Sequence, residues 1–235
     1  MEVHAHTHTA RKKWTHYLWE FLMLFLAVFC GFLAENQREH YIEHQREKQY
    51  IASLINDIKS DLYQLDDLDK EWEKSLEAAD SLLTCLTGKE IYTNSCPAFQ
   101  LVYRSTGFTD FVSNDGTIQQ LKNSGGLRLL RKSKIADSIM SYQKTVDRIN
   151  IKQAAMNEAQ QYRSRITDLF DVINISLAND EDIPLLNGDK KALNSAYNYI
   201  RIWKDKFIGL RSLCYETREC GKRLLKAIHE QYGIK

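Results

Sequence analysis

The hydrophobic positions of this chain follow two different patterns, one near the N-terminus and one in the remainder. From Phe21 to Ala34, fourteen apolar or small residues follow one another without a break. Because a helix rises about 1.5 Å per residue, residues 14–34 would span roughly 31 Å, which is the thickness of a bilayer core. The pattern therefore predicts a transmembrane helix over residues 14–35.

The flanks of this segment favour an uncleaved signal anchor. Residues 11–13 form a basic cluster just outside it, and an aromatic belt follows at Trp14, Tyr17 and Trp19. A signal-peptide cut after Ala34 would place the bulky Phe32 where a small residue is expected. A lipoprotein cut before Cys30 would place Phe29 in a similar position.

The basic residues on the two sides of the segment indicate its orientation. Residues 11–13 stand nearly free of acidic neighbours, whereas Arg38, Arg46 and Lys48 are interleaved with glutamates. We therefore expect a short His-rich tail, residues 1–13, in the cytoplasm, and residues 36–235 outside it. This orientation corresponds to a single-pass protein of the inner (cytoplasmic) membrane with a periplasmic C-terminal domain.

Three later segments carry apolar residues at alternating steps of three and four. The first consists of Ile51, Ile55, Ile58, Leu62, Leu65, Asp69, Trp72, Leu76, Ala79, Leu83 and Leu86. The second consists of Ile135, Ile139, Tyr142, Val146 and Ile149, then slips in phase and resumes at Ala155, Ala159, Tyr162, Ile166, Leu169 and Ile173. The third consists of Leu193, Ala196, Ile200, Trp203, Phe207, Leu210, Cys214, Thr217, Gly221, Leu224 and Ile228. These patterns predict long helices over about residues 36–87, 134–178 and 189–232, each with one apolar seam.

Seams of this length have to be buried, so we expect them to pack against one another in up-down-up order. In the intervening stretch, residues 113–115 predict the N-cap of a short helix over about 113–123. This helix and the nearby aromatic residues would complete a four-helix core. The predicted fold is all-α: an N-terminal transmembrane helix followed by a long antiparallel bundle of three to four helices with coiled-coil-like packing.

Composition and charge exclude several classes of function. The 32 basic and 31 acidic residues nearly balance, and no basic stripe indicates a nucleic-acid partner. An acidic cluster matches no calcium loop and is interpreted as a solvated helix face; it comprises Asp61, Asp66, Asp67, Asp69, Glu71 and Glu73. No pattern typical of a nucleophile, a nucleotide site or a glycosidase is present, so we predict neither an enzyme nor a cofactor.

Two groups of histidines are candidate metal ligands. His4, His6 and His8 alternate in the N-terminal tail, where imidazoles can bind a transition metal without any fold. His40 and His44 lie four residues apart, and hence on one helix face, among glutamates. The alternative interpretations are a solvated polar tail and a polar belt beside the membrane.

Four cysteines lie beyond the apolar segment, and an even number in an exported domain permits two disulfides with three pairings. Cys85 and Cys96 bracket a short loop and form the favoured candidate pair. Cys214 falls on the third seam and is interpreted as a small core residue.

Two longer blocks of sequence carry a family resemblance. They are WEFLMLFLAVFCGFLAENQREH at 19–40 with EKQYIASLINDIKSD at 47–61, and DGTIQQLKNSGGLRLLRKSKIADSIMSYQ at 115–143. With these blocks the chain resembles a family of bacterial single-span helical membrane proteins of unknown function. The resemblance implies a membrane protein and carries over no catalytic or ligand-binding residue.

Three classes of function follow from these patterns. The leading hypothesis is a membrane-anchored helical scaffold or accessory protein whose partners are the lipid bilayer and either a second copy or another membrane protein. Small residues at Ala27, Gly31 and Ala34 would let another transmembrane helix approach. The alternatives are an extracytoplasmic sensor that works with a separate signalling partner and a metal-handling protein that uses the histidines.

Overall fold

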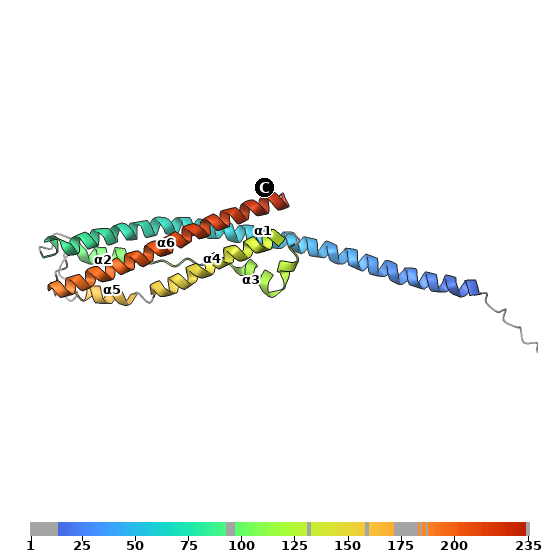
Figure 1. Ribbon diagram of the computed structural model, residues 1–235, viewed down its shortest axis with the longest axis horizontal. Coiled ribbons are helices and arrows are strands. Elements are labelled where there is room, and N and C mark those ends of the chain that lie inside the picture. The colour runs from blue at the N-terminus through green and yellow to red at the C-terminus, as the bar shows by residue number, and fades with distance from the viewer. Residues whose placement is uncertain are drawn as a thin grey trace, which may run out of the picture. The chain divides into compact units, whose positions relative to one another are not determined.

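The computed structural model describes residues 14–92, 97–130, 133–157, 160–171, 183, 185–186 and 188–233. Over these residues the protein is all-helical, with one long apolar helix at the N-terminal end, as predicted (Figure 1). The longer helices are α1 (Trp14–Thr87), α2 (Ala98–Thr106), α3 (Gly116–Asn123), α4 (Ser133–Asn157), α5 (Gln160–Thr167) and α6 (Lys190–Tyr232). Short 3-10 turns, η1 and η2, occupy Glu90–Tyr92 and Gly126–Arg128. The chain divides into two compact units, Met1–Gln49 and Tyr50–Lys235.

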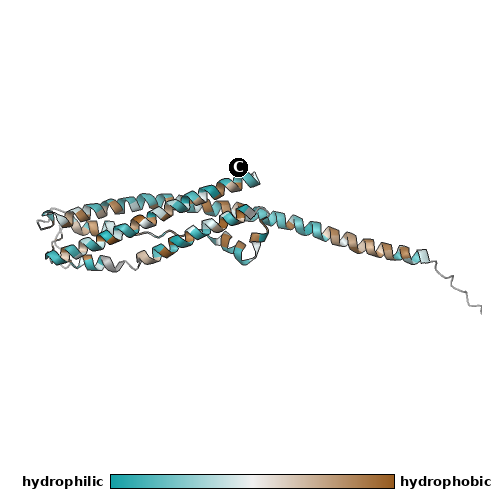
Figure 2. Cartoon of the chain, in the orientation of Figure 1, coloured by the Kyte–Doolittle hydropathy of each residue, from teal (hydrophilic) through white to brown (hydrophobic). Residues whose placement is uncertain are grey.

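The described part of the first unit is the N-terminal portion of α1. Every residue from Trp14 to Tyr41 is exposed, although the part from Phe21 to Ala34 consists of apolar or small residues (Figure 2). The rings of Phe21, Phe25 and Phe29 stack along one side of the helix, with centroids 6.3 and 5.9 Å apart. By length and composition this segment is a candidate membrane span.

The second unit is built around the three predicted seams. All eleven residues predicted for the third seam are buried along α6. In α1 the buried positions form a wider stripe than predicted, because Leu54, Leu68 and Leu82 are buried beside the seam. The apolar residues fall into two core clusters, one lined by α1, α4 and α6 and one lined by the end of α1, α2, α5 and the start of α6.

Pairs of contacting residues show the directions of the long helices in this unit. Between α1 and α6, Asp66 pairs with Arg218 and Asp80 with Lys204, so these helices are antiparallel. Between α4 and α6, Ser141 contacts Cys220 and Arg148 pairs with Glu216, so these are antiparallel too. Helices α1 and α4 therefore run in the same direction, which differs from the predicted up-down-up order (Figure 1).

The chain returns between α1 and α4 through a segment that is not helical, residues 107–115, which we call the strap. Thr109 is bonded to Glu71 of α1, and Asn114 is bonded to Asp61. The five residue steps from Thr109 to Asn114 thus run alongside the ten residue steps between Asp61 and Glu71, which correspond to about 15 Å of helix. Covering that distance requires an extended backbone. The predicted helix at 113–123 accordingly begins only at Gly116.

The region of the predicted helix 134–178 contains two described helices, α4 and α5. The expected slip in phase is wrong at Ala155, which is exposed, because the buried stripe continues through Gln153 and Met156 without a change of period. Helix α5 ends at Thr167, and Phe170 then forms an isolated antiparallel bridge with Leu185. The last predicted seam residue, Ile173, lies outside the described residues.

Candidate functional site

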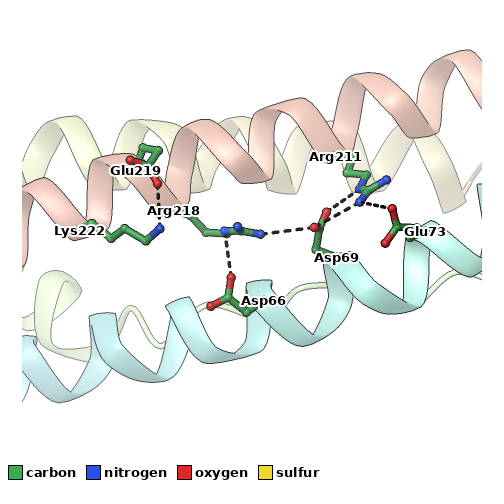
Figure 3. A network of polar contacts seen from close by, with 7 residues as sticks. All are labelled: Asp66, Asp69, Glu73, Arg211, Arg218, Glu219 and Lys222. Carbon is green, nitrogen blue, oxygen red and sulfur yellow. Dashed lines mark hydrogen bonds and ion pairs between the residues drawn. The ribbon is translucent and has the colours of Figure 1, made fainter.

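A ladder of ion pairs joins α1 to α6. Basic residues recur every seven positions on α6, at Lys204, Arg211 and Arg218, and each meets an acidic residue of α1. Figure 3 shows the central part of this ladder. The side chain of Lys204 pairs with Asp80.

Asp69 is the centre of the ladder, because it is shared by two guanidinium groups. Arg211 donates from Nε to Asp69 Oδ1 (2.6 Å) and from Nη2 to Oδ2 (3.3 Å), and its Nη2 also lies 3.4 Å from Glu73. Arg218 Nη1 lies 3.6 Å from Asp69, while its Nε lies 3.1 Å from Asp66. The hydrogen bonds from Arg211 lower the pKa of Asp69 despite its partial burial. The ladder thus fixes which faces of α1 and α6 meet and at what register.

The interpretation of the acidic cluster as a solvated face is wrong at Asp61, which is buried, and at Asp69, which is partly buried, whereas its other four members are exposed. Asp66, Asp69 and Glu73 form ion pairs with α6, and Glu71 accepts a hydrogen bond from Thr109. Asp61 is buried, with 1% of its surface exposed. All members of the cluster except Asp67 thus contact either α6 or the segment 107–115.

The strap is attached to α1 by side chains of α1 that accept hydrogen bonds. Val112 N donates to Gln64 (2.9 Å), Asn114 N donates to Asp61 Oδ1 (2.7 Å), and Asn114 Nδ2 donates to the same oxygen (2.9 Å). Just after the strap, Thr117 N donates to Asp57 (3.4 Å). Positions 57, 61, 64 and 71 follow steps of four, three and seven, so a polar stripe runs along α1 beside its apolar seam. That spacing is a sequence signal for a polar contact along this side of α1, but it does not identify residues 107–115 as the segment that makes the contact.

Helices α4 and α1 hold the strap from different sides. Gln153 of α4 accepts from Phe111 N (2.8 Å) and donates to Phe111 O (3.0 Å), as a neighbouring strand would. Tyr142 of α4 donates from its hydroxyl to Asp61 Oδ2 (2.7 Å). These bonds satisfy the buried polar groups at this junction and explain why Gln153 occupies a core position of α4.

The Asp61 carboxylate is the most buried acidic group of this junction. Burial raises its pKa above the ordinary value of 3.8, and the negative charge of Asp57 acts in the same direction. The hydrogen bonds from Asn114 and Tyr142 favour the ionised form and oppose this shift. Burial and the neighbouring Asp61 also raise the pKa of Tyr142, so its hydroxyl stays a proton donor at neutral pH.

The candidate metal ligands in the described part of the chain are engaged with carboxylates. His40 Nδ1 lies 3.8 Å from Glu43, and His44 Nδ1 lies 3.3 Å from Glu47. Among the described residues, no group of three His, Cys, Asp or Glu side chains is arranged to hold a metal ion. His4, His6 and His8 lie outside the described residues.

The cysteines beyond the span occupy different environments. Cys85 is disulfide-bonded, while Cys96, its predicted partner, lies outside the described residues. Cys214 and Cys220 are free and buried. Cys214 is 2% exposed, which fits its interpretation as a small core residue, and burial raises the pKa of its thiol to about 12.

The small residues of the candidate span lie together on one face of α1. At 3.6 residues per turn, Ala27, Gly31 and Ala34 fall within about 60° of one another, and a Cβ atom added at Gly31 would meet no atom within 4 Å. The four phenylalanines of the span, at positions 21, 25, 29 and 32, fall on the opposite face. The helix therefore presents one smooth and one bulky side.

An open groove of about 780 Å³ lies beside the start of α6 in the second unit. Its described lining includes Tyr92, Tyr197, Lys190 and Lys191 but no carboxylate. These residues therefore supply no pair of carboxylates. Comparisons with protein families, with curated proteins and with solved structures find no match to this chain.

Proposed function

We propose that this protein is a membrane-anchored helical scaffold or accessory protein that acts through association with proteins and not through catalysis. The observation that carries the proposal is the apolar segment Trp14–Ala34, which is exposed on every side. Apolar surface of this extent is costly in water and requires lipid or another apolar helix around it. The seams of the second unit, in contrast, are buried within the unit itself.

The finer features of the proposal rest on sequence patterns. The protein spans a bacterial inner membrane once, with residues 1–13 in the cytoplasm and the helical domain in the periplasm. The heptad steps of α1, α4 and α6 favour coiled-coil-like packing in that domain. Reporter fusions after Lys235 test the orientation: a reporter active only outside the cytoplasm should work, and activity of a cytoplasm-only reporter would overturn it.

The proposed contact surface within the membrane is the small face of the span. Without large side chains at Ala27, Gly31 and Ala34, a second helix could approach closely and gain packing contacts that lipid does not provide. The opposite, phenylalanine-rich face would then meet lipid. Either a second copy or another single-span protein fits this surface.

Cys30 provides a native probe for this association, since it is free and exposed and lies beside the small face. We expect mild oxidation of native membranes to link the chain through Cys30 to a second copy or to one reproducible partner. Gly31→Leu should abolish the product, whereas Val28→Leu, on another face, should leave it intact. A chain that stays monomeric under both oxidation and amine-directed crosslinking would contradict the proposal.

One observation favours the alternative function, a sensor that relays a signal through the span. Asp69 is shared by Arg211 and Arg218, so after a small shift of α6 along α1 its carboxylate would still lie near one of the two guanidinium groups. Helix shifts of this kind carry signals in other helical proteins. Locking α6 to α1 with a disulfide between the helices should abolish a sensor's output but leave scaffold binding unchanged.

A further inference from the structure

We propose that the strap over α1 is a pH-sensitive latch, which closes more firmly as the Asp61 carboxyl takes up a proton. The site is the junction of α1, the strap and α4, and its ligand is the proton. The latch would regulate how often the strap opens, and it is independent of the proposed association within the membrane.

The geometry makes Asp61 the main anchor of the strap. Its Oδ1 accepts both the backbone N–H and the side-chain amide of Asn114, at 2.7 and 2.9 Å, and its Oδ2 accepts the Tyr142 hydroxyl at 2.7 Å. The other bonds between strap and α1 reach residues that are at least partly exposed, such as Gln64 and Glu71. Opening the strap would hydrate a carboxylate that is otherwise buried.

Among the described residues, the groups around Asp61 include no cation that pairs with its charge. On α1 it faces Asp57, which is also an acid, and on α4 it faces Tyr142. Cys220 of α6 lies next to Tyr142, since its Sγ contacts Ser141, and Asp115 follows Asn114 at the end of the strap. No described Lys, Arg or His side chain forms an ion pair with Asp61. A proton is therefore the cation that this site can take.

Protonation would preserve the bonds that hold the strap. A neutral carboxyl still accepts both Asn114 bonds at Oδ1, and Oδ2–H can donate to the Tyr142 oxygen in place of accepting from it. These hydrogen bonds weaken when the charge is lost, but the cost of burying that charge is removed as well, and burial is the larger of the two effects on Asp61. Because burial raises the pKa of Asp61 in the closed state above its ordinary value of 3.8, the closed state binds the proton more tightly. Lowering the pH through the interval between these two values therefore favours closure.

Hydrogen exchange of the full chain in detergent micelles or nanodiscs tests the latch. After correction for intrinsic exchange rates, we expect protection of the Val112 and Asn114 amides to rise as the pH falls from 7 to 4. The rise should be about tenfold for each unit by which the closed-state pKa exceeds the open-state value. Asp61→Asn should remove this pH dependence, whereas Asp69→Asn, on the same helix, should leave it unchanged. Protection that is independent of pH, or that still depends on pH in Asp61→Asn, would overturn the proposal.

Tyr142→Phe provides a second variant in case Asp61→Asn does not fold. Loss of the hydroxyl removes one hydrogen bond to the ionised carboxylate, so the charged, closed state becomes less favourable. The strap amides should then exchange faster at pH 7 and gain more protection on acidification than in the wild type. An unchanged pH response of Tyr142→Phe would count against Asp61 as the titrating group.

Discussion

Two stretches of the same helix, α1, differ in whether their apolar residues are buried. From Trp14 to Ala34 every residue is exposed, including Phe21 at 65% and Met23 at 69%. From Ile51 to Leu86 the apolar residues occupy one stripe, and Ile58 and Leu65 are completely buried. The secondary structure is the same, so the difference lies in the distribution of polar residues around the helix axis.

This difference shows which solvent each stretch requires. The second stretch has a polar face for water and an apolar stripe covered by α4 and α6. The first has no polar face, and within the described residues nothing covers it. It is therefore the stretch that we propose lies in lipid, and substitutions to charged residues should affect the two stretches by different mechanisms.

The largest effect is expected from a charge placed in the core of the second unit. Phe207 is 1% exposed and packs against Trp72, Phe108 and Trp203. Phe207→Asp should lower the free energy of unfolding by about 4 kcal/mol or more, since it leaves a cavity and an unpaired buried charge. Denaturation followed by circular dichroism checks this. The control, Tyr215→Asp on the exposed side of α6, should stay within about 0.5 kcal/mol of the wild type.

A charge in the first stretch should act on membrane insertion and leave the fold of the second unit unchanged. Phe25→Asp at the centre of the span should disfavour insertion by about 3 kcal/mol. The fraction of chain recovered in membranes measures this effect, and Phe25→Leu is the matched control. Equal membrane recovery of Phe25→Asp and Phe25→Leu would mean that this stretch does not lie in hydrocarbon.

A smaller effect distinguishes the two neighbouring positions where the predicted and observed phases of α4 differ. Met156 is 2% exposed, and Ala155 is exposed. Met156→Ala should cost about 2 kcal/mol of stability, whereas Ala155→Ser should change it by less than about 0.5 kcal/mol. Chemical denaturation of the two variants checks the phase. A larger loss of stability for Ala155→Ser than for Met156→Ala would instead support the predicted slip in phase.

The smallest effect concerns the ion-pair ladder. Asp69 and Arg211 are each about two-thirds buried, so a double-mutant cycle with Asp69→Asn and Arg211→Met should give a coupling of about 1 kcal/mol. The more exposed pair Arg148–Glu216 should give less. Because the pKa of Asp69 is lowered, its contribution is present above its ordinary pKa of 3.8 and is lost as the pH falls through the lowered value. Thermal unfolding at several pH values should show that Arg211→Met loses this part of the acid dependence.

The regular parts of the fold were predictable from spacing alone. The seam of α6 could be listed from sequence because its period continues over the whole helix and each position faces the same core. Both ends of this helix are also determined by nearby residues. At the N-terminal end Asp189 Oδ1 accepts a hydrogen bond from Ala192 N, and at the C-terminal end Gly233 adopts the left-handed conformation. The ion-pair ladder could have been found from the seven-residue spacing of Lys204, Arg211 and Arg218.

The strap and its anchor could not be predicted in the same way. An extended segment that is held by side chains has no period of its own, and its partners lie about 40 to 50 positions away, as for Val112 with Gln64 and Phe111 with Gln153. In the sequence, Asp61 cannot be distinguished from the exposed acids near it, because its burial depends on the strap that covers it. The shared direction of α1 and α4 follows from this return segment, which the predicted short helix did not reveal.

Alkaline carbonate extraction of membranes that contain the full chain tests the central claim most directly, because it separates spanning proteins from those bound at the surface. We predict that the chain stays in the membrane pellet and that its release requires detergent, since Trp14–Ala34 would have to transfer its apolar surface to water. Recovery of the intact chain in the carbonate supernatant would contradict the claim that this segment spans a bilayer.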